Sequence, residues 1–130
     1  MRARVNAYHA DNLKEWSVDF GGSFFCIAIS KGYSNFVHTD ATDHCKSYAI
    51  VVPFGDFTGG DFSLPSRGIS VPVAPGQFLA VTASFLPHCV METIGTRYAL
   101  TFFTEENVAT KARDVLIQLG LKVSDLNFTP

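Results

Sequence analysis

The chain has few charged residues, and their two signs are nearly balanced. Charged residues make up 17% of the 130 positions, with 10 Lys and Arg against 12 Asp and Glu, for a net charge of −2. Disordered chains are rich in charge and poor in apolar residues, so the 47% hydrophobic content excludes disorder. No general basic field is present to hold a phosphate backbone or an anionic membrane. A nucleic-acid partner would therefore require a local basic patch.

Cysteines are few, and long apolar segments are missing. Cys26, Cys45 and Cys89 are odd in number and form no CxxC pair, which argues against a disulfide scaffold and for a reducing compartment. The apolar runs, such as 49–53, fall far short of the roughly 20 residues that span a bilayer. The N-terminus lacks the apolar core of a signal peptide. We expect an intracellular protein, in the cytoplasm or the nucleus, without a membrane partner.

Between residues 23 and 104 the sequence contains short β-rich runs separated by turn residues. The spacing of turns, about 8–12 residues, is typical of an all-β sandwich, jelly roll or barrel. Gly-rich segments at 55–62 and 94–97 are expected to be tight turns, and Pro53 is expected at a strand end or edge. The predicted strands are 23–30, 36–40, 47–54, 61–65, 68–73, 78–83, 85–92 and 97–104.

Two helices are expected to flank this β region. Residues 11–16 predict a short N-terminal helix, and residues 105–119 predict a longer C-terminal helix that begins after Thr104 and ends at Gly120. No linker interrupts the pattern, so residues 1–130 are interpreted as one domain. Few residues precede the first strand, which would leave one sheet face bare. We expect either the C-terminal helix or a second copy of the chain, in a homodimer, to cover it.

His38, Asp40 and His88 are the candidate metal ligands. Side chains two positions apart on an extended strand face the same way, so His38 and Asp40 can converge on one ion. His88 follows in another strand-like run, which a closed β architecture can return beside the first. Two imidazoles and one carboxylate are the ligand set of non-haem Fe(II) oxygenases. Zinc also accepts these ligands, so the three residues do not name the metal.

Arg97 is the candidate anion-binding residue. An Arg that points into a β-barrel is costly to bury unpaired, and a carboxylate accepts its bidentate fork of hydrogen bonds. A metal triad with such an Arg fits a 2-oxo acid that carries a distal carboxylate. The alternative interpretations are a core or turn histidine at His88, beside Pro87, and a surface charge at Arg97 that pairs with Glu92.

Other polar and aromatic residues are weaker candidates. Asp43 and His44 follow the HxD motif at the expected mouth of the site, where a solvated polar loop is the simpler interpretation. Cys89 is expected on the opposite face from its neighbour His88, in the core. Phe57 and Phe62 flank the Gly-rich segment and are expected to pack, with a lid as the alternative.

The HTD motif at 38–40, the later His88 and Arg97 in RYALTFF resemble the 2-oxoglutarate- and Fe(II)-dependent dioxygenases, over residues 23–104. GDFTGGDFSLPSRG, PGQFLAVTASFLPH and GTRYALTFFT look like small fungal oxygenase-like domains related to the Tet/JBP nucleobase oxygenases. The resemblance implies a double-stranded β-helix, or jelly roll. It implies that His38, Asp40 and His88 form the catalytic site around Fe(II), and that Arg97 binds the distal carboxylate of 2-oxoglutarate.

The activity implied by this resemblance is oxidation of a C–H bond in an organic substrate, with release of succinate and CO2. A small molecule and a nucleobase are both open as substrates, although the net charge does not favour nucleic acid. A catalytically silent β-helix that only binds ligand is one rival interpretation. A cupin-like metalloenzyme is another, but the usual cupin pattern begins with HxH, whereas this chain has HxD.

Overall fold

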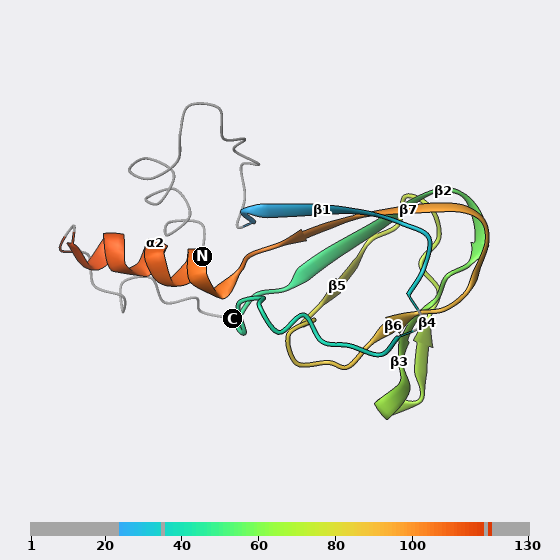
Figure 1. The fold of residues 1–130 in the computed structure, drawn as a ribbon, viewed down its shortest axis with the longest axis horizontal. Coiled ribbons are helices and arrows are strands. Elements are labelled where there is room, and N and C mark those ends of the chain that lie inside the picture. The colour runs from blue at the N-terminus through green and yellow to red at the C-terminus, as the bar shows by residue number, and fades with distance from the viewer. Residues whose placement is uncertain (1–23, 35, 119, 121–130) are drawn as a thin grey trace.

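The computed structural model describes residues 24–34, 36–118 and 120, and it consists mainly of antiparallel β-strands (Figure 1). The four-stranded sheet has the order β1-β7-β2-β5, and the three-stranded sheet has the order β4-β3-β6. Every paired strand is antiparallel to its neighbour. The elements are β1 (Cys26–Lys31), β2 (Ala49–Gly59), β3 (Phe62–Leu64), the 3₁₀ turn η1 (Pro65–Arg67), β4 (Ile69–Val71), β5 (Leu79–Val81), β6 (Cys89–Val90), β7 (Thr93–Phe103) and α2 (Glu106–Gln118).

The structure confirms the prediction of a β protein with a C-terminal helix. α2 differs from the predicted 105–119 by one residue at each end. The predicted helix at 11–16 lies outside the described residues, and the assignment of one domain over 1–130 stays a prediction. The described part of the chain contains no helix long and apolar enough to cross a membrane.

β2 and β7 form a long antiparallel pair, and here two sequence predictions are wrong. β2 runs through the expected turn to Gly59, and the expected turn at 94–97 lies inside β7. Gly55 and Gly95 both have positive φ, of 115° and 101°. A Cβ on either would lie 2.3 Å from a carbonyl oxygen of the facing strand. The glycines therefore let the two strands approach where the pattern suggested a reversal of the chain.

Pro53 lies within β2 rather than at its end, and it is fully buried. It pairs with Ala99 of β7, whereas β5 pairs only with Ala49–Val51 of β2. On the side of β2 away from β7, no strand pairs with Pro53. The missing N–H of the proline therefore removes no hydrogen bond between strands on that side. The Pro53 carbonyl accepts a hydrogen bond from the Gly76 N–H at 2.9 Å.

The predicted strand at 36–40 is reduced to a single bridge between His38 and His88, and the predicted strand at 85–92 to the two residues of β6. The buried core cluster lies beside this region and links the two sheets. Its members are Ala49, Phe62, Val73, Val81 and Ala83, with Leu64, Val71, Leu79, Leu86, Val90 and Phe103 packed against them.

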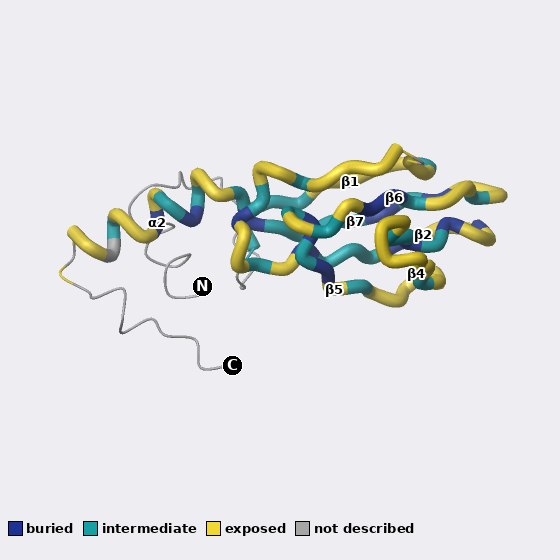
Figure 2. The backbone as a smooth tube through the Cα atoms, turned by 90° about the horizontal axis from the view of Figure 1, so that it is seen from below, coloured by how far each residue is buried: buried dark blue, intermediate teal, exposed yellow. Residues whose placement is uncertain are grey.

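α2 does not cover a face of either sheet. Figure 1 shows the helix running on from the end of β7, beyond the strands. Of the two expected covers for the bare face, the C-terminal helix is therefore wrong, and a second copy of the chain stays a prediction. Figure 2 shows β1 exposed along most of its length, and Ile29 on that strand is 72% exposed.

Candidate metal centre

His38 and His88 are held side by side by their own backbones. The His38 N–H donates to the His88 carbonyl at 3.0 Å, and the His88 N–H donates to the His38 carbonyl at 2.9 Å. This isolated antiparallel bridge joins residues 50 positions apart, and it places their ring centroids 4.5 Å from each other. The main chain therefore fixes the separation of the two imidazoles.

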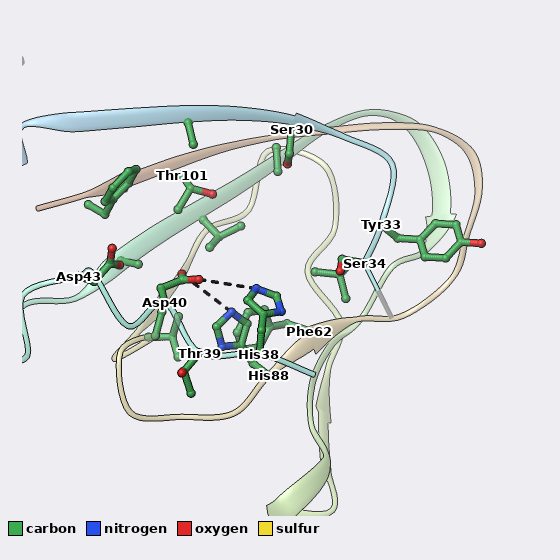
Figure 3. Close-up of a pocket in the computed structure, with 18 of the residues that line it drawn as sticks. Ser30, Tyr33, Ser34, His38, Thr39, Asp40, Asp43, Phe62, His88 and Thr101 are labelled. Carbon is green, nitrogen blue, oxygen red and sulfur yellow. Dashed lines mark ion pairs between the residues drawn. The ribbon is translucent and has the colours of Figure 1, made fainter. Parts of the chain in front are cut away.

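Asp40 faces both imidazoles, as the alternation of an extended segment requires (Figure 3). Its carboxylate oxygens lie 3.6 Å from Nε2 of His38 and 4.0 Å from Nε2 of His88. One nitrogen or oxygen from each of the three residues lies within 4.8 Å of the others. Ligands at about 2.0–2.2 Å from one ion lie about 3–4 Å apart, so a small closure brings all three into coordination.

Each imidazole points its Nε2 at the Asp40 carboxylate because its Nδ1 is hydrogen-bonded to a backbone carbonyl. Nδ1 of His38 donates to the Phe36 carbonyl at 2.9 Å, and Nδ1 of His88 donates to the Leu86 carbonyl at 2.8 Å. Both carbonyls belong to the residue two positions earlier in the chain. With the proton on Nδ1, Nε2 carries the free lone pair that a metal requires.

The three side chains line a cavity of about 740 Å³ between the two sheets. Small residues on the inward faces of the strands leave this space open, among them Ala28 and Ser30 of β1 and Ala99 of β7. The volume lies within the range of about 300–1,000 Å³ that is usual for ligand pockets. The Asp40 N–H donates to the Ala83 carbonyl at 3.0 Å, which fixes the HxD segment at the cavity wall.

Arg97 also lines this cavity, and only 5% of its surface is exposed. Nη1 donates to the Gly32 carbonyl at 3.1 Å, while Nε is buried without a hydrogen-bond partner. Among the described residues no carboxylate pairs with this guanidinium, so the expected alternative of an ion pair with Glu92 does not occur. Burial lowers the pKa of Arg97, because removal from water disfavours the charged form of the guanidinium.

Asp43 and His44 have different surroundings. Asp43 lines the cavity, and burial raises its pKa to about 6, with the charges of Asp40 and Glu105 acting in the same direction. His44 is 8% exposed, and its Nδ1 accepts a hydrogen bond from the Lys46 N–H at 3.2 Å. His44 is thus buried and does not line the cavity. For this residue the interpretation as part of a solvated loop at the mouth of the site is wrong.

Phe62 and Phe57 contact the site, and sequence reasoning assigned them only to packing or a lid. The Phe62 ring stacks on the His88 ring, with centroids 4.9 Å apart and planes 18° apart. The guanidinium carbon of Arg97 lies 5.8 Å from the centroid of the Phe57 ring. The sequence feature that could have identified them is the repeated GDF at 55–57 and 60–62. It places one phenylalanine before the Gly59–Gly60 pair and one after it. Cys89 is buried and does not line the cavity, as expected.

No protein-family model matches the chain, and no curated protein matches it by sequence. Among solved structures, the fold is similar to that of NgTET1 in complex with 5mC DNA, with a TM-score of 0.64 and 21% sequence identity. The similarity covers 81% of this chain and 40% of the NgTET1 chain, so the chain spans less than half the length of this neighbour. At this identity the likeness shows the fold.

The donor set fits a divalent transition metal. Two imidazoles and one carboxylate on one side of an ion form the facial triad that leaves other coordination positions open. The cavity that the three donors line has space for further ligands, and Arg97 in the same cavity would offer its unpartnered Nε–H to an anion. The arrangement is therefore able to hold a metal and an anionic ligand together.

Proposed function

We propose that the protein is an Fe(II)- and 2-oxoglutarate-dependent dioxygenase that oxidises a C–H bond of an organic substrate and releases succinate and CO2. In this proposal the two sheets are the walls of a double-stranded β-helix, or jelly roll. His38, Asp40 and His88 are the metal ligands and the catalytic centre, and Arg97 binds the co-substrate. The observation that carries the proposal is the presence of the three donors and the uncompensated guanidinium in one cavity.

The residues of the chain have separate tasks in this proposal. His38 and His88 present Nε2 because Nδ1 is bonded to backbone carbonyls. Arg97 holds the distal carboxylate of 2-oxoglutarate through charge-assisted hydrogen bonds. When bound, the iron and 2-oxoglutarate supply the oxidative chemistry, while the protein binds and orients the C–H bond.

The test is succinate formation from 2-oxoglutarate with Fe(II) and oxygen, measured by mass spectrometry with and without added substrates. Slow succinate release is expected even without substrate, and Asp40→Ala should abolish it. Asp56→Ala is the matched control, because Asp56 is an exposed carboxylate on β2 that is not among the cavity residues. Absence of succinate from wild-type protein that binds both metal and 2-oxoglutarate would favour the silent binding protein instead.

A nucleobase is the second candidate substrate. The supporting observation is the fold similarity to NgTET1 in complex with 5mC DNA, which agrees with the resemblance of the sequence motifs to Tet/JBP oxygenases. The test is incubation with duplex and single-stranded DNA that contains 5-methylcytosine, followed by nucleoside mass spectrometry. Oxidised 5-methylcytosine in the wild-type reaction, and none with Asp40→Ala, would establish this substrate.

Two further parts of the proposal concern the state of the protein. An intracellular location, in the cytoplasm or the nucleus, agrees with the three free cysteines. A homodimer remains a proposal, and sedimentation equilibrium tests it. A monomer across the micromolar range would remove the dimer.

A further inference from the structure

The guanidinium of Arg97 is oriented by contacts with Gly32 and Phe57. Its Nη1 donates to the Gly32 carbonyl at 3.1 Å, and the Phe57 ring lies 5.8 Å from its central carbon. Gly32 follows β1 and Phe57 lies on β2, so elements on both sides of β7 fix this side chain. The Gly32 N–H in turn donates to the Arg97 carbonyl at 2.8 Å, so two hydrogen bonds link these residues.

The Gly32 contact occupies one side of the guanidinium and leaves the donors of another edge without a partner among the described residues. Nη1 lies on the side of the group away from the Nε–H, whereas Nε and Nη2 donate in parallel along one edge. Nε is buried without a partner, and the structure gives Nη2 no hydrogen bond within the described residues. Two parallel donors of this kind match the two oxygens of a carboxylate.

Gly60 lies beside the buried Nε end of this unpartnered edge. A Cβ at Gly60 would lie 3.3 Å from Nε and 3.2 Å from Cδ of Arg97, and 2.5 Å from the side chain of Thr93. Any side chain at this position would therefore press on the Nε end of the arginine. Its positive φ of 74° also favours glycine.

We propose that Gly60, with the Gly32 carbonyl and the Phe57 ring, positions Arg97 so that its Nε–Nη2 edge is the carboxylate fork, and that Gly60 thereby determines selectivity for 2-oxo dicarboxylates. This inference rests on the proposed function, because it assigns the positioning residues of the co-substrate site. Gly60 makes no contact with the ligand in this scheme and acts through Arg97.

The chain offers a matched control in the neighbouring glycine. Gly59 has a φ of 73°, and a Cβ there would lie 2.7 Å from the Glu92 carbonyl oxygen. Gly59→Ala and Gly60→Ala therefore share the strain of a positive φ. The new methyl group meets the Glu92 backbone at position 59, but the side chains of Thr93 and Arg97 at position 60. Phe57→Leu is a second variant, which removes the ring face while keeping an apolar side chain.

The experiment measures binding to the Mn(II)-loaded full chain by isothermal titration calorimetry. The two probes are 2-oxoglutarate and 2-oxobutyrate, which share the 2-oxo acid group but differ in the distal carboxylate. Wild type and Gly59→Ala are expected to bind 2-oxoglutarate more tightly by about tenfold or more, the value of at least one charge-assisted hydrogen bond. Gly60→Ala should lose most of this preference while its affinity for 2-oxobutyrate stays unchanged, and Phe57→Leu should lose part of it.

The outcomes separate this inference from the proposed function. Retention of the full preference by Gly60→Ala and Phe57→Leu overturns the positioning role and leaves the oxygenase proposal intact. Equal loss in Gly59→Ala and Gly60→Ala also overturns it, because strain of the Gly pair would then be the cause. A wild-type protein that binds neither probe overturns the proposed function itself. If Gly60→Ala does not fold, the preference of Phe57→Leu decides.

Discussion

The backbones of His38 and His88 exchange two hydrogen bonds, and this bridge sets the geometry of the proposed metal site. Residues 50 positions apart are thereby held with their rings 4.5 Å from each other. The same segments supply the Phe36 and Leu86 carbonyls that orient the two imidazoles. Backbone contacts thus set the spacing and the orientation of the two nitrogen donors.

Replacement of each histidine should separate metal binding from stability. His88→Ala should destabilise the metal-free protein by about 1–3 kcal/mol, because it removes a buried ring that stacks on Phe62. His38→Ala should cost less than about 1 kcal/mol, since its side chain is 45% exposed. Both should lose Mn(II) binding. Urea unfolding and metal titration check this, and equal destabilisation by the two changes would contradict the assigned burial.

Arg97→Lys should raise the KM for 2-oxoglutarate by about tenfold or more, because a lysine ammonium is a point charge without a planar fork. The kcat should change less, since Arg97 is not among the three metal donors. Steady-state succinate formation gives both constants. A fall in kcat at an unchanged KM would assign Arg97 a different role.

Side chains at the glycines where β2 and β7 approach closely should destabilise the protein. Gly55→Ala places a Cβ 2.3 Å from the Thr96 carbonyl oxygen, and it should destabilise the protein by more than about 2 kcal/mol. Gly68→Ala is the control, because it also has positive φ but a Cβ there meets nothing within 4 Å. That variant should lose only about 1–2 kcal/mol from its backbone conformation. Urea unfolding that gives the reverse order would contradict the close approach of the strands.

Asp43 should make the metal-free protein more stable as the pH falls from 7 toward 4. Its pKa is about 6 in the folded state, above its usual value of 3.8, so the folded state binds this proton first. The stabilising effect of protonation is complete below the unfolded pKa and is lost as pH rises through about 6. Asp43→Asn should reduce this slope. Unfolding of both proteins at several pH values measures it, and an unchanged slope would refute the shift.

The three cysteines should differ in their reactivity. Burial, followed by the negative charge of Glu105, raises the pKa of the Cys26 thiol, so less of it is thiolate at neutral pH. Cys45 is exposed and Cys89 is buried. Iodoacetamide should therefore modify Cys45 first, Cys26 more slowly and Cys89 last, as followed by peptide mass spectrometry. Equal rates in urea serve as the control, and rapid labelling of Cys89 in the native protein would contradict the order.

Local properties of the sequence determined the strand-rich character, the C-terminal helix and the pairing of His38 with Asp40. Alternation along an extended segment depends only on backbone geometry, so the HxD motif already places both side chains on one face. Helical spacing of apolar residues after Thr104 likewise predicted α2 to within one residue at each end.

Only the tertiary structure decided the rest of the site. Pairing of His38 with His88 depends on contacts between distant segments, which no local pattern encodes. Gly95 suggested a turn, but inside β7 it permits close approach to β2. Arg97 therefore lies inside β7 and lines the cavity, whereas the sequence placed it at the boundary between a turn and a strand. Glycine is compatible with both a turn and a close contact between strands. Which of the two forms at Gly95 depends on its pairing with β2, which is a tertiary contact.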